Sequence, residues 1–104
     1  MKYSIKFGRT FKQSIKKLKK RYPSVKKDVE IGIEVLLDNP RLGVLIPGGS
    51  GVRKPRLRNS DVKRGKSCSY RMLYYFEDQE AGCIFLLLLY AKSDISRINN
   101  PVNP

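Results

Sequence analysis

Apolar residues recur along the chain with two different periods, and the period separates helices from strands. Between residues 10 and 38 they recur at spacings of three and four, the stripe of an amphipathic helix. Pro23 divides this stretch, so it predicts two helices, with Thr10 and Ser24 as their N-caps. Asn39-Pro40 ends the second helix, and the short link predicts an antiparallel hairpin. The stripes are Phe11, Ile15, Leu18 and Tyr22, then Val25, Val29, Ile33, Leu36 and Leu37.

Strand-like segments lie on both sides of the helical part. Alternation predicts a first strand, and a loop with four glycines separates the helices from three further strands. The last of these is a continuous apolar run, which favours a strand buried on both faces at the sheet centre; a buried helix is the competing interpretation. A single helical turn is expected at Asp94–Ile98. The predicted strands are Lys2–Phe7, Val52–Arg58, Tyr70–Glu77 and Cys83–Ala91.

The resulting element order is β-α-α-β-β-β. It predicts an α+β fold, with the helix hairpin packed on one face of a small, mainly antiparallel four-stranded sheet. The other face stays partly open, which makes it the expected place for a site. We expect a single domain over residues 1–98 and a short tail over residues 99–104.

The charge of the chain is strongly unbalanced. It has 22 Lys and Arg against nine Asp and Glu, a net charge of +13. Such a balance indicates an anionic partner, and it favours nucleic acid over an acidic protein or a membrane surface. No signal-peptide or membrane-spanning pattern is found, so a cytoplasmic protein without a membrane partner is expected. Cys68 and Cys83 have no metal-type spacing and histidine is absent, so we expect no metal and no cofactor.

One group of cations lies near the N-terminus. Residues 1–27 carry eleven Lys or Arg and no acid. Like charges on one helix repel each other, which favours a role in holding a phosphate backbone; a merely solvated helix face is the alternative. The cluster assigned to the first helix is Lys12, Lys16, Lys17, Lys19, Lys20 and Arg21.

A second group of cations follows the predicted sheet. In a strand, Lys54, Arg56 and Arg58 share one face, whereas Pro55 and Leu57 point toward the helices. In an antiparallel meander the end of one strand, the start of the next and the end of the third lie together. The meander therefore predicts that four cations gather at one edge of the sheet, namely Arg56, Arg58, Arg71 and Lys92.

The order of these motifs resembles the toxins of the RelE/ParE superfamily, particularly the HigB-like RelE branch. The resemblance covers roughly Phe11–Ser93. Its anchors are Asn39-Pro40 with Gly43, Gly51-Val52-Arg53-Lys54, Arg56, Gly65-Lys66, Tyr70-Arg71-Met72-Leu73-Tyr74-Tyr75 and Leu88-Leu89-Tyr90-Ala91-Lys92.

The resemblance implies a RelE-like fold and the toxin of a type II toxin–antitoxin module, with an acidic antitoxin as partner. The RelE branch cleaves messenger RNA on the ribosome without a metal. Carried over by position, it implies the catalytic set Lys54, Arg56, Lys66, Arg71 and Lys92. Contacts to RNA and the ribosome are expected from Lys12, Lys16, Lys17, Lys19, Lys20, Arg21, Arg53, Arg58, Lys63 and Arg64.

These residue types suit cleavage by the neighbouring 2'-hydroxyl, which needs a base, donors for the phosphate charge and an acid for the leaving 5'-oxygen. Arg71 is the candidate for phosphate stabilisation because its planar fork can bind two oxygens. Lys54, crowded by other cations, is the candidate base, and Lys92 completes the phosphate clamp or serves as the acid. Tyr74, Tyr75 and Tyr90 either stack on a base or pack in the core, and alternation favours the core for Tyr74.

Three features depart from the family pattern: Pro55 stands where Leu is usual, Cys68-Ser69 replaces small glycines, and the tail after Lys92 is short. Pro55 lacks a backbone donor, which predicts a strand at the sheet edge. Two alternatives therefore stay open beside the ribonuclease: a non-catalytic RNA-binding protein descended from such a toxin, and a ParE-like gyrase poison.

Overall fold

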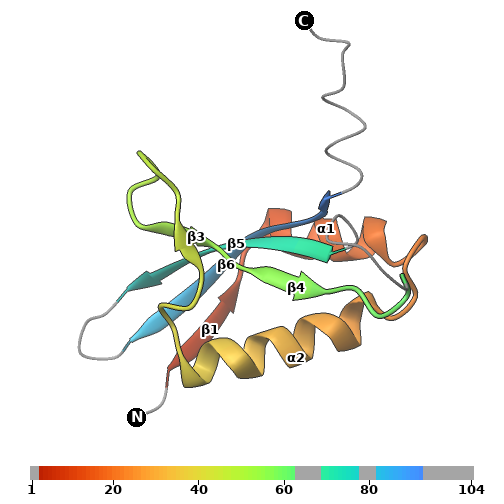
Figure 1. Ribbon diagram of the computed structural model, residues 1–104, viewed down its shortest axis with the longest axis horizontal. Helices are drawn as coiled ribbons and strands as arrows, with labels where there is room; N and C mark the ends of the chain where they lie inside the picture. The colour runs from red at the N-terminus through yellow and green to blue at the C-terminus, as the bar shows by residue number, and fades with distance from the viewer. Residues whose placement is uncertain (1–2, 63–68, 78–81, 93–104) are drawn as a thin grey trace, which may run out of the picture.

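The computed structural model describes residues 3–62, 69–77 and 82–92. The predicted α+β class is confirmed: two helices lie against a mixed sheet (Figure 1). The described part of the sheet has six strands, two more than expected, because one predicted strand is divided and the glycine loop contributes another. In chain order the elements are β1 Ser4–Phe7, α1 Arg9–Leu18, α2 Val25–Asp38, β2 Val44–Leu45, β3 Val52–Lys54, β4 Arg56–Arg58, β5 Ser69–Glu77 and β6 Cys83–Ala91.

The sheet is mixed because β1 pairs in parallel with β6, whereas the other neighbours are antiparallel. Its strand order is β1-β6-β5-β3-β2, with β4 pairing to β5 beside β3. The strand β6 therefore lies between β1 and β5. The predicted turn at Asp94–Ile98 lies outside the described residues.

Pro55 divides the predicted strand Val52–Arg58 without shifting its register. Arg53 pairs with Tyr74 and Arg56 with Arg71, so each strand advances by the same three residues across the interruption. The carbonyl of Pro55 still accepts a hydrogen bond from the Met72 N–H (3.3 Å), but proline has no N–H to return. Among the described strands β4 has no neighbour besides β5, which confirms the predicted edge position.

The glycine-rich segment forms a hairpin rather than a plain loop. Val44 pairs with Lys54, so β2 covers the outer side of β3. Three of the four positions from Gly48 to Gly51 have positive φ, namely Gly48 (72°), Ser50 (55°) and Gly51 (95°), which lets the chain reverse within a few residues. Val44 is 77% exposed on this hairpin.

Helix α1 begins earlier and ends earlier than predicted. Its N-cap is Gly8, not Thr10, because the Gly8 N–H donates to the Leu86 carbonyl (2.9 Å) and the chain turns directly from β1 into the helix. A Cβ atom at Gly8 would lie 2.9 Å from that same oxygen, so glycine permits the close approach. Tyr22 follows the helix but is still buried, with its ring edge against Tyr70 (5.8 Å between centroids).

Helix α2 follows its prediction more closely. Ser24 is the N-cap residue, although its side chain makes no capping bond; its N–H donates to Asp61 Oδ2 (2.8 Å). Val25, Val29 and Leu36 are buried, but Leu37, which was predicted to face the core, is exposed. Figure 1 shows α2 running back along the sheet in the opposite sense to α1, as the hairpin prediction requires.

The core lies between the helices and one face of the sheet. From α1 and α2 it takes Phe11, Leu18, Val25, Val29 and Leu36, and from the strands Leu57, Tyr70, Met72, Tyr74, Ile84, Leu86, Leu89 and Ala91. The prediction that β6 is buried on both faces is wrong for the second face, because both helices lie on one side. There Leu87 is 36% exposed, at a point where the register with β5 shifts. We call the side of the sheet opposite the helices the open face.

Candidate functional site

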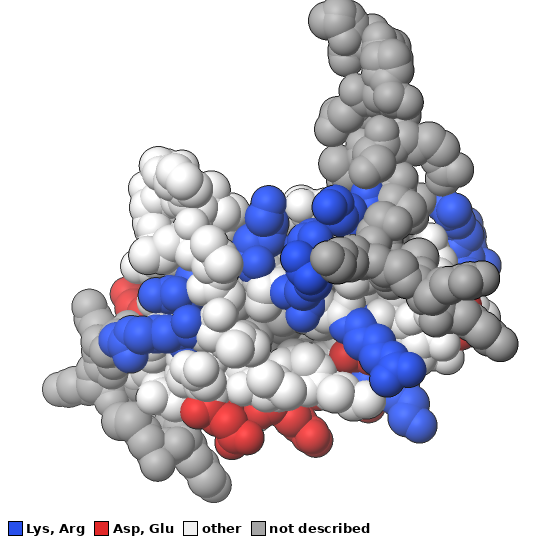
Figure 2. Space-filling model, viewed as in Figure 1, with Lys and Arg blue, Asp and Glu red and all other residues white. Residues whose placement is uncertain are grey.

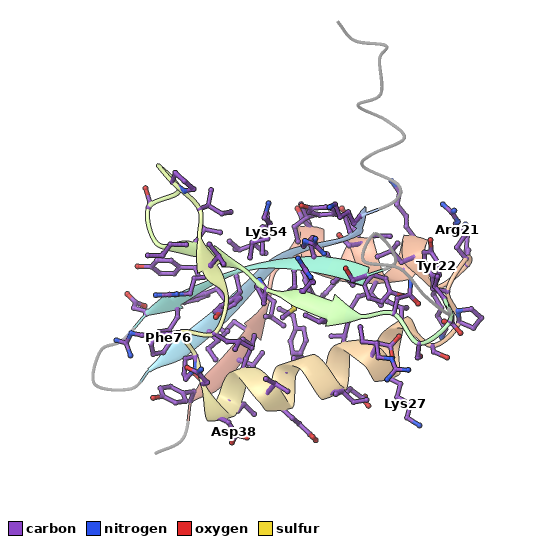
Figure 3. The ribbon with its side chains drawn as sticks, in the orientation of Figure 1. Arg21, Tyr22, Lys27, Asp38, Lys54 and Phe76 are labelled. Atoms are coloured by element: carbon purple, nitrogen blue, oxygen red, sulfur yellow. The ribbon has the colours of Figure 1, made fainter. Side chains whose placement is uncertain are left out.

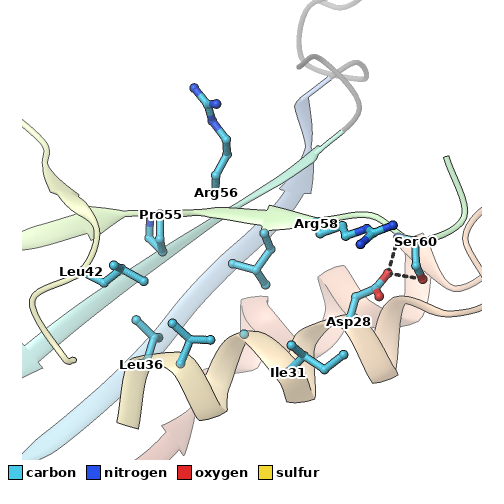
Figure 4. Close-up of a pocket in the computed structure, with 11 residues that line it drawn as sticks. Asp28, Ile31, Leu36, Leu42, Pro55, Arg56, Arg58 and Ser60 are labelled. Carbon is cyan, nitrogen blue, oxygen red and sulfur yellow. Dashed lines mark hydrogen bonds between the residues drawn. The ribbon is translucent and has the colours of Figure 1, made fainter. Parts of the chain in front are cut away.

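A row of exposed cations runs along β3 and β4. Lys54, Arg56 and Arg58 are exposed, while Pro55 and Leu57 between them are buried, so the predicted alternation is confirmed. Lys54 points away from α2 in Figure 3. Arg56 and Pro55 leave opposite sides of the strand in Figure 4.

The register brings a second arginine to this row. Arg56 lies directly opposite Arg71 of β5, and Arg71 lies directly opposite Tyr90 of β6, so the three side chains share the open face. Within the part of the chain that the structure describes, no carboxylate pairs with either arginine. Like charges directly opposite each other destabilise a sheet, and a bound anion would remove that cost.

Arg71 is the most confined cation of the group, with only 9% of its surface exposed. Its Nη1 donates to Ser69 Oγ at 2.6 Å, from two residues earlier on the same face of β5. This contact fixes the direction of the guanidinium. In the sequence analysis Ser69 was interpreted only as a departure from the family's small glycines. A hydroxyl two residues before an arginine, on the same face of a strand, nevertheless indicates a hydrogen bond between the two side chains.

Lys92 follows β6 directly and is half-buried. Ala91 pairs with Tyr70, and Arg58 pairs with Ser69. Lys92 therefore lies at the end of the sheet where β4 also ends. Lys66, Lys63 and Arg64 lie outside the described residues. The structure therefore brings Arg56, Arg71 and Tyr90 into one row, with Lys54 and Arg58 beside them on the same strand pair.

Arg53 does not stand with the open-face cations, although it was predicted to contact RNA. It pairs with Tyr74, whose side chain faces the helices. Its Nη1 donates to the carbonyls of Gly43 (2.7 Å) and Arg41 (3.0 Å), in the segment after α2. Arg53 thus ties this segment to the sheet.

The cations of the N-terminal cluster surround a separate depression. Lys12, Lys16 and Lys17 lie on α1 and are exposed, whereas Lys19, Lys20 and Arg21 lie in the turn after it, not on the helix as predicted. Arg21 also lies over the Tyr22 ring, 5.3 Å from its centroid. An open pocket of about 620 Å³ is lined by Thr10, Gln13, Ser14, Lys16, Lys17, Lys20 and Leu88. Three ammonium groups around one hollow suit a phosphate backbone.

The tyrosines divide between the two faces. Tyr74 is fully buried, as predicted; its hydroxyl donates to the Pro40 carbonyl (2.6 Å) and accepts from the Gly43 N–H (3.3 Å). Burial raises the pKa of Tyr74, against the lowering effect of the Gly43 bond and Arg53. Tyr75 and Tyr90 are half-buried on the open face, where Tyr75 lies against Phe85 (6.1 Å between centroids).

Charge is distributed unevenly over the molecule. In Figure 2 basic side chains gather over the sheet, while acidic side chains line the side formed by α2. Helix α2 carries four of the nine acids, Asp28, Glu30, Glu34 and Asp38. Among the described residues no group of three or more acidic or cysteine side chains could hold a metal ion. Neither described helix has the length and apolar character to cross a membrane.

The whole arrangement is similar to a solved toxin structure. The chain matches a mutant of the Escherichia coli toxin RelE in the free state, with a TM-score of 0.61 and 17% sequence identity. The match covers 98% of this chain and 96% of that one. No protein-family model matches the sequence. The chain therefore has a RelE-like fold, as predicted.

Proposed function

We propose that this protein is the toxin of a type II toxin–antitoxin module and that it cleaves translated messenger RNA on the ribosome. The observation that carries the proposal is the pair Arg56 and Arg71, directly opposite each other on the open face and without a carboxylate among the described residues. The RelE-like fold supports the choice of toxin class. Such a protein acts in the cytoplasm, where its substrate is.

The proposed reaction is attack of a 2'-hydroxyl on the adjacent phosphate. Arg71, held by Ser69, stabilises the charge that develops on the phosphate oxygens, and Arg56 adds a second donor from the neighbouring strand. Lys54 is the candidate base for the 2'-hydroxyl proton, and Lys92 is the candidate acid for the leaving 5'-oxygen. Lys66 belongs to this proposed catalytic set on the family resemblance alone.

The cations at α1 have a different proposed role. Lys12, Lys16 and Lys17, with Lys19, Lys20 and Arg21 after the helix, contact phosphates of messenger or ribosomal RNA without reading sequence. Such contacts orient the protein, so that the open face meets the scissile phosphate.

The test is induced expression in bacteria, followed by primer extension on messenger RNA and by cleavage with purified ribosomes in the presence of EDTA. We expect new 5' ends within translated regions that do not depend on added metal. Arg71→Ala should lower cleavage by about a hundredfold or more, as expected for one lost oxyanion donor. The matched control is Lys27→Ala, an exposed cation on α2 that points away from the sheet (Figure 3); it should retain full activity.

Three outcomes would overturn the proposal. Growth arrest without new 5' ends, accompanied by gyrase–DNA cleavage complexes, would indicate the gyrase poison. RNA binding with no cleavage product would indicate a non-catalytic RNA-binding protein. Full activity of a folded Arg71→Ala protein would exclude this arginine row as the reaction site.

A further inference from the structure

Two aromatic side chains lie on the open face, at the end of the sheet away from the pair Arg56 and Arg71. Tyr75 of β5 is directly opposite Phe85 of β6, and their ring centroids are 6.1 Å apart with 32° between the ring planes. Both side chains are half-buried, and the core with its helices lies on the other side of the sheet. The two rings therefore present one aromatic surface to the open face, which we call the aromatic platform.

The turn of the β2–β3 hairpin fixes the position of the Tyr75 ring. A Cβ atom at Gly51 would lie 3.0 Å from Cε1 and 3.4 Å from Cδ1 of Tyr75, so the hairpin backbone reaches the edge of the ring. Gly51 has a φ of 95°, which permits this close approach. Because the ring is held before any ligand binds, stacking on it carries a small entropic cost.

Lysines flank the aromatic platform on the neighbouring strands. Lys6 of β1 pairs with Phe85, so its exposed side chain stands beside that ring on the open face. The register of β3 places the exposed Lys54 opposite Leu73, one step along the same face from Tyr75. Aromatic rings between lysines suit a single-stranded nucleic acid, whose bases stack while its phosphates meet the ammonium groups.

The aromatic platform is in line with the proposed reaction site. Tyr75 is four residues along β5 from Arg71, which corresponds to about 13 Å at 3.3 Å per residue. The interval is filled by Leu73 and Leu88, which pair with each other and are half-buried. An RNA strand with a phosphate at Arg71 can therefore reach the aromatic platform with a base a few nucleotides away.

An acidic residue marks the far end of this surface. Glu77 follows Tyr75 on the same face of β5 and pairs with Cys83. Among the described strand residues of the open face it is the one acid. Its carboxylate would repel a phosphate, so we expect an RNA strand to leave the sheet beyond the aromatic platform.

We propose that the aromatic platform stacks on one unpaired base of a single-stranded RNA, a few nucleotides from the phosphate held at Arg71. That this RNA is the cleaved messenger rests on the proposed function; the platform and its lysines do not. Lys6 and Lys54 contact the phosphates on either side of the stacked base. Stacking tolerates every base, so the platform lengthens the contact with RNA without adding a sequence preference.

The experiment compares two oligonucleotides of equal length and charge, each bound to the purified full chain. One is a single-stranded RNA with 2'-O-methyl groups, which 2'-hydroxyl attack cannot cleave, and the other has the same backbone without bases. Both offer the same phosphates to the lysines, so the ratio of their Kd values measures the contribution of the bases. We expect the strand with bases to bind at least about fivefold tighter. Added salt should weaken both and leave the ratio unchanged.

Leucine variants separate stacking from packing, because leucine removes the ring and keeps an apolar side chain. Tyr75→Leu and Phe85→Leu should each lower the preference for bases about fivefold or more. The matched control is Phe7→Leu, an exposed aromatic of β1 whose ring lies against Phe11 on the helix side (6.0 Å between centroids); it should keep the preference. In the unchanged protein, NMR signals of the Tyr75 and Phe85 rings should shift with the strand that has bases and not with the other.

Binding is measured without cleavage, so the two proposals can fail separately. Cleavage of messenger RNA together with equal binding of both strands, or binding of neither, would overturn this inference and leave the proposed function standing. A preference for bases that is lost in Tyr75→Leu, without any cleavage, would do the reverse. A preference that survives Tyr75→Leu and disappears in Tyr90→Leu would overturn the inference, since stacking would then lie beside Arg71. So would its loss in a folded Phe7→Leu protein.

Discussion

Tyr70 and Tyr74 lie on the same strand and are both fully buried, but their hydroxyl groups have different surroundings. The Tyr74 hydroxyl bonds to Pro40 and Gly43, and so holds the segment after α2. The Tyr70 hydroxyl has no hydrogen-bond partner among the described residues. A buried polar group that bonds stabilises a fold, whereas one that does not bond carries a desolvation cost.

This contrast predicts opposite effects of one chemical change. Tyr74→Phe should lower the free energy of unfolding by about 1–3 kcal/mol, because it leaves the Pro40 carbonyl buried without its donor. Tyr70→Phe should change stability little or raise it. Urea unfolding of both variants checks the pair, and an equal loss in both would contradict it.

The pH dependence of stability gives a second measurement on Tyr70. Its pKa is raised by burial first, then by the charges of Asp28 and Asp61 and by Tyr22. The unfolded chain releases this proton near pH 10, while the folded chain keeps it. The contribution of Tyr70 to stability should therefore be constant below about pH 10 and be lost as the pH rises above it, so Tyr70→Phe should make the alkaline loss of stability shallower.

Because Arg56 and Arg71 lie opposite each other, one substitution should raise the stability of the fold and lower RNA binding and cleavage. Arg56→Thr removes a like-charge pair with Arg71 and should stabilise the protein by a few tenths to about 1 kcal/mol. The same change should weaken RNA binding and cleavage. Because salt screens the repulsion, the gain in stability should shrink at high ionic strength. A destabilised Arg56→Thr protein at low salt would contradict this account.

Alternation alone predicts that Lys54, Arg56 and Arg58 share one face of the sheet, and for Arg53, which was expected to contact RNA, the same pattern gives the opposite face. Alternation places Arg53 with Pro55 and Leu57, so its orientation toward the helices follows from the same pattern that selected Lys54 and Arg56. Its carbonyl partners at Arg41 and Gly43 were not predictable, because they depend on how the segment after α2 returns to the sheet.

At the scale of elements, the strands with a clear alternation or a long apolar run were predicted and the close approaches were not. Cys83–Ala91 was placed correctly, and Val52–Arg58 kept its register despite the break at Pro55. Strand β2 is only two residues long and has no period to recognise. The start of α1 depends on a contact with Leu86, which is distant in sequence, so Thr10 was chosen on local preference alone.

The helix start gives a direct prediction. Gly8→Ala should destabilise the fold by about 1–3 kcal/mol, because its Cβ would meet the Leu86 carbonyl and force β1 away from β6. Thr10→Ala should change stability by less than about 0.5 kcal/mol, since Thr10 is not the N-cap. Thermal unfolding checks both predictions. A loss of about 1 kcal/mol for Thr10→Ala would indicate that Thr10, and not Gly8, is the N-cap of α1.

At the scale of the molecule, the two groups of cations have different measurable effects. Exposed lysines on α1 act through phosphate charge, so RNA affinity should fall steeply with salt. Lys16→Ala and Lys17→Ala should each lower the slope of log affinity against log salt by about one, while Lys27→Ala should not. Once RNA is saturating, these changes should leave the cleavage rate unchanged. A loss of rate at saturation would instead place α1 in the chemistry.

The parallel pairing of β1 with β6 has a consequence for the growing chain. Helix α1 and strand β1 both pack on the last described strand, and β5 also needs it as a neighbour. A nascent chain that ends before β6 has no partner for either, and Tyr90 has not yet joined Arg71 on the open face. Contacts between segments so distant in sequence form late. The sheet can therefore be completed, with β1, α1 and β5 all packed on β6, only after synthesis has passed Ala91.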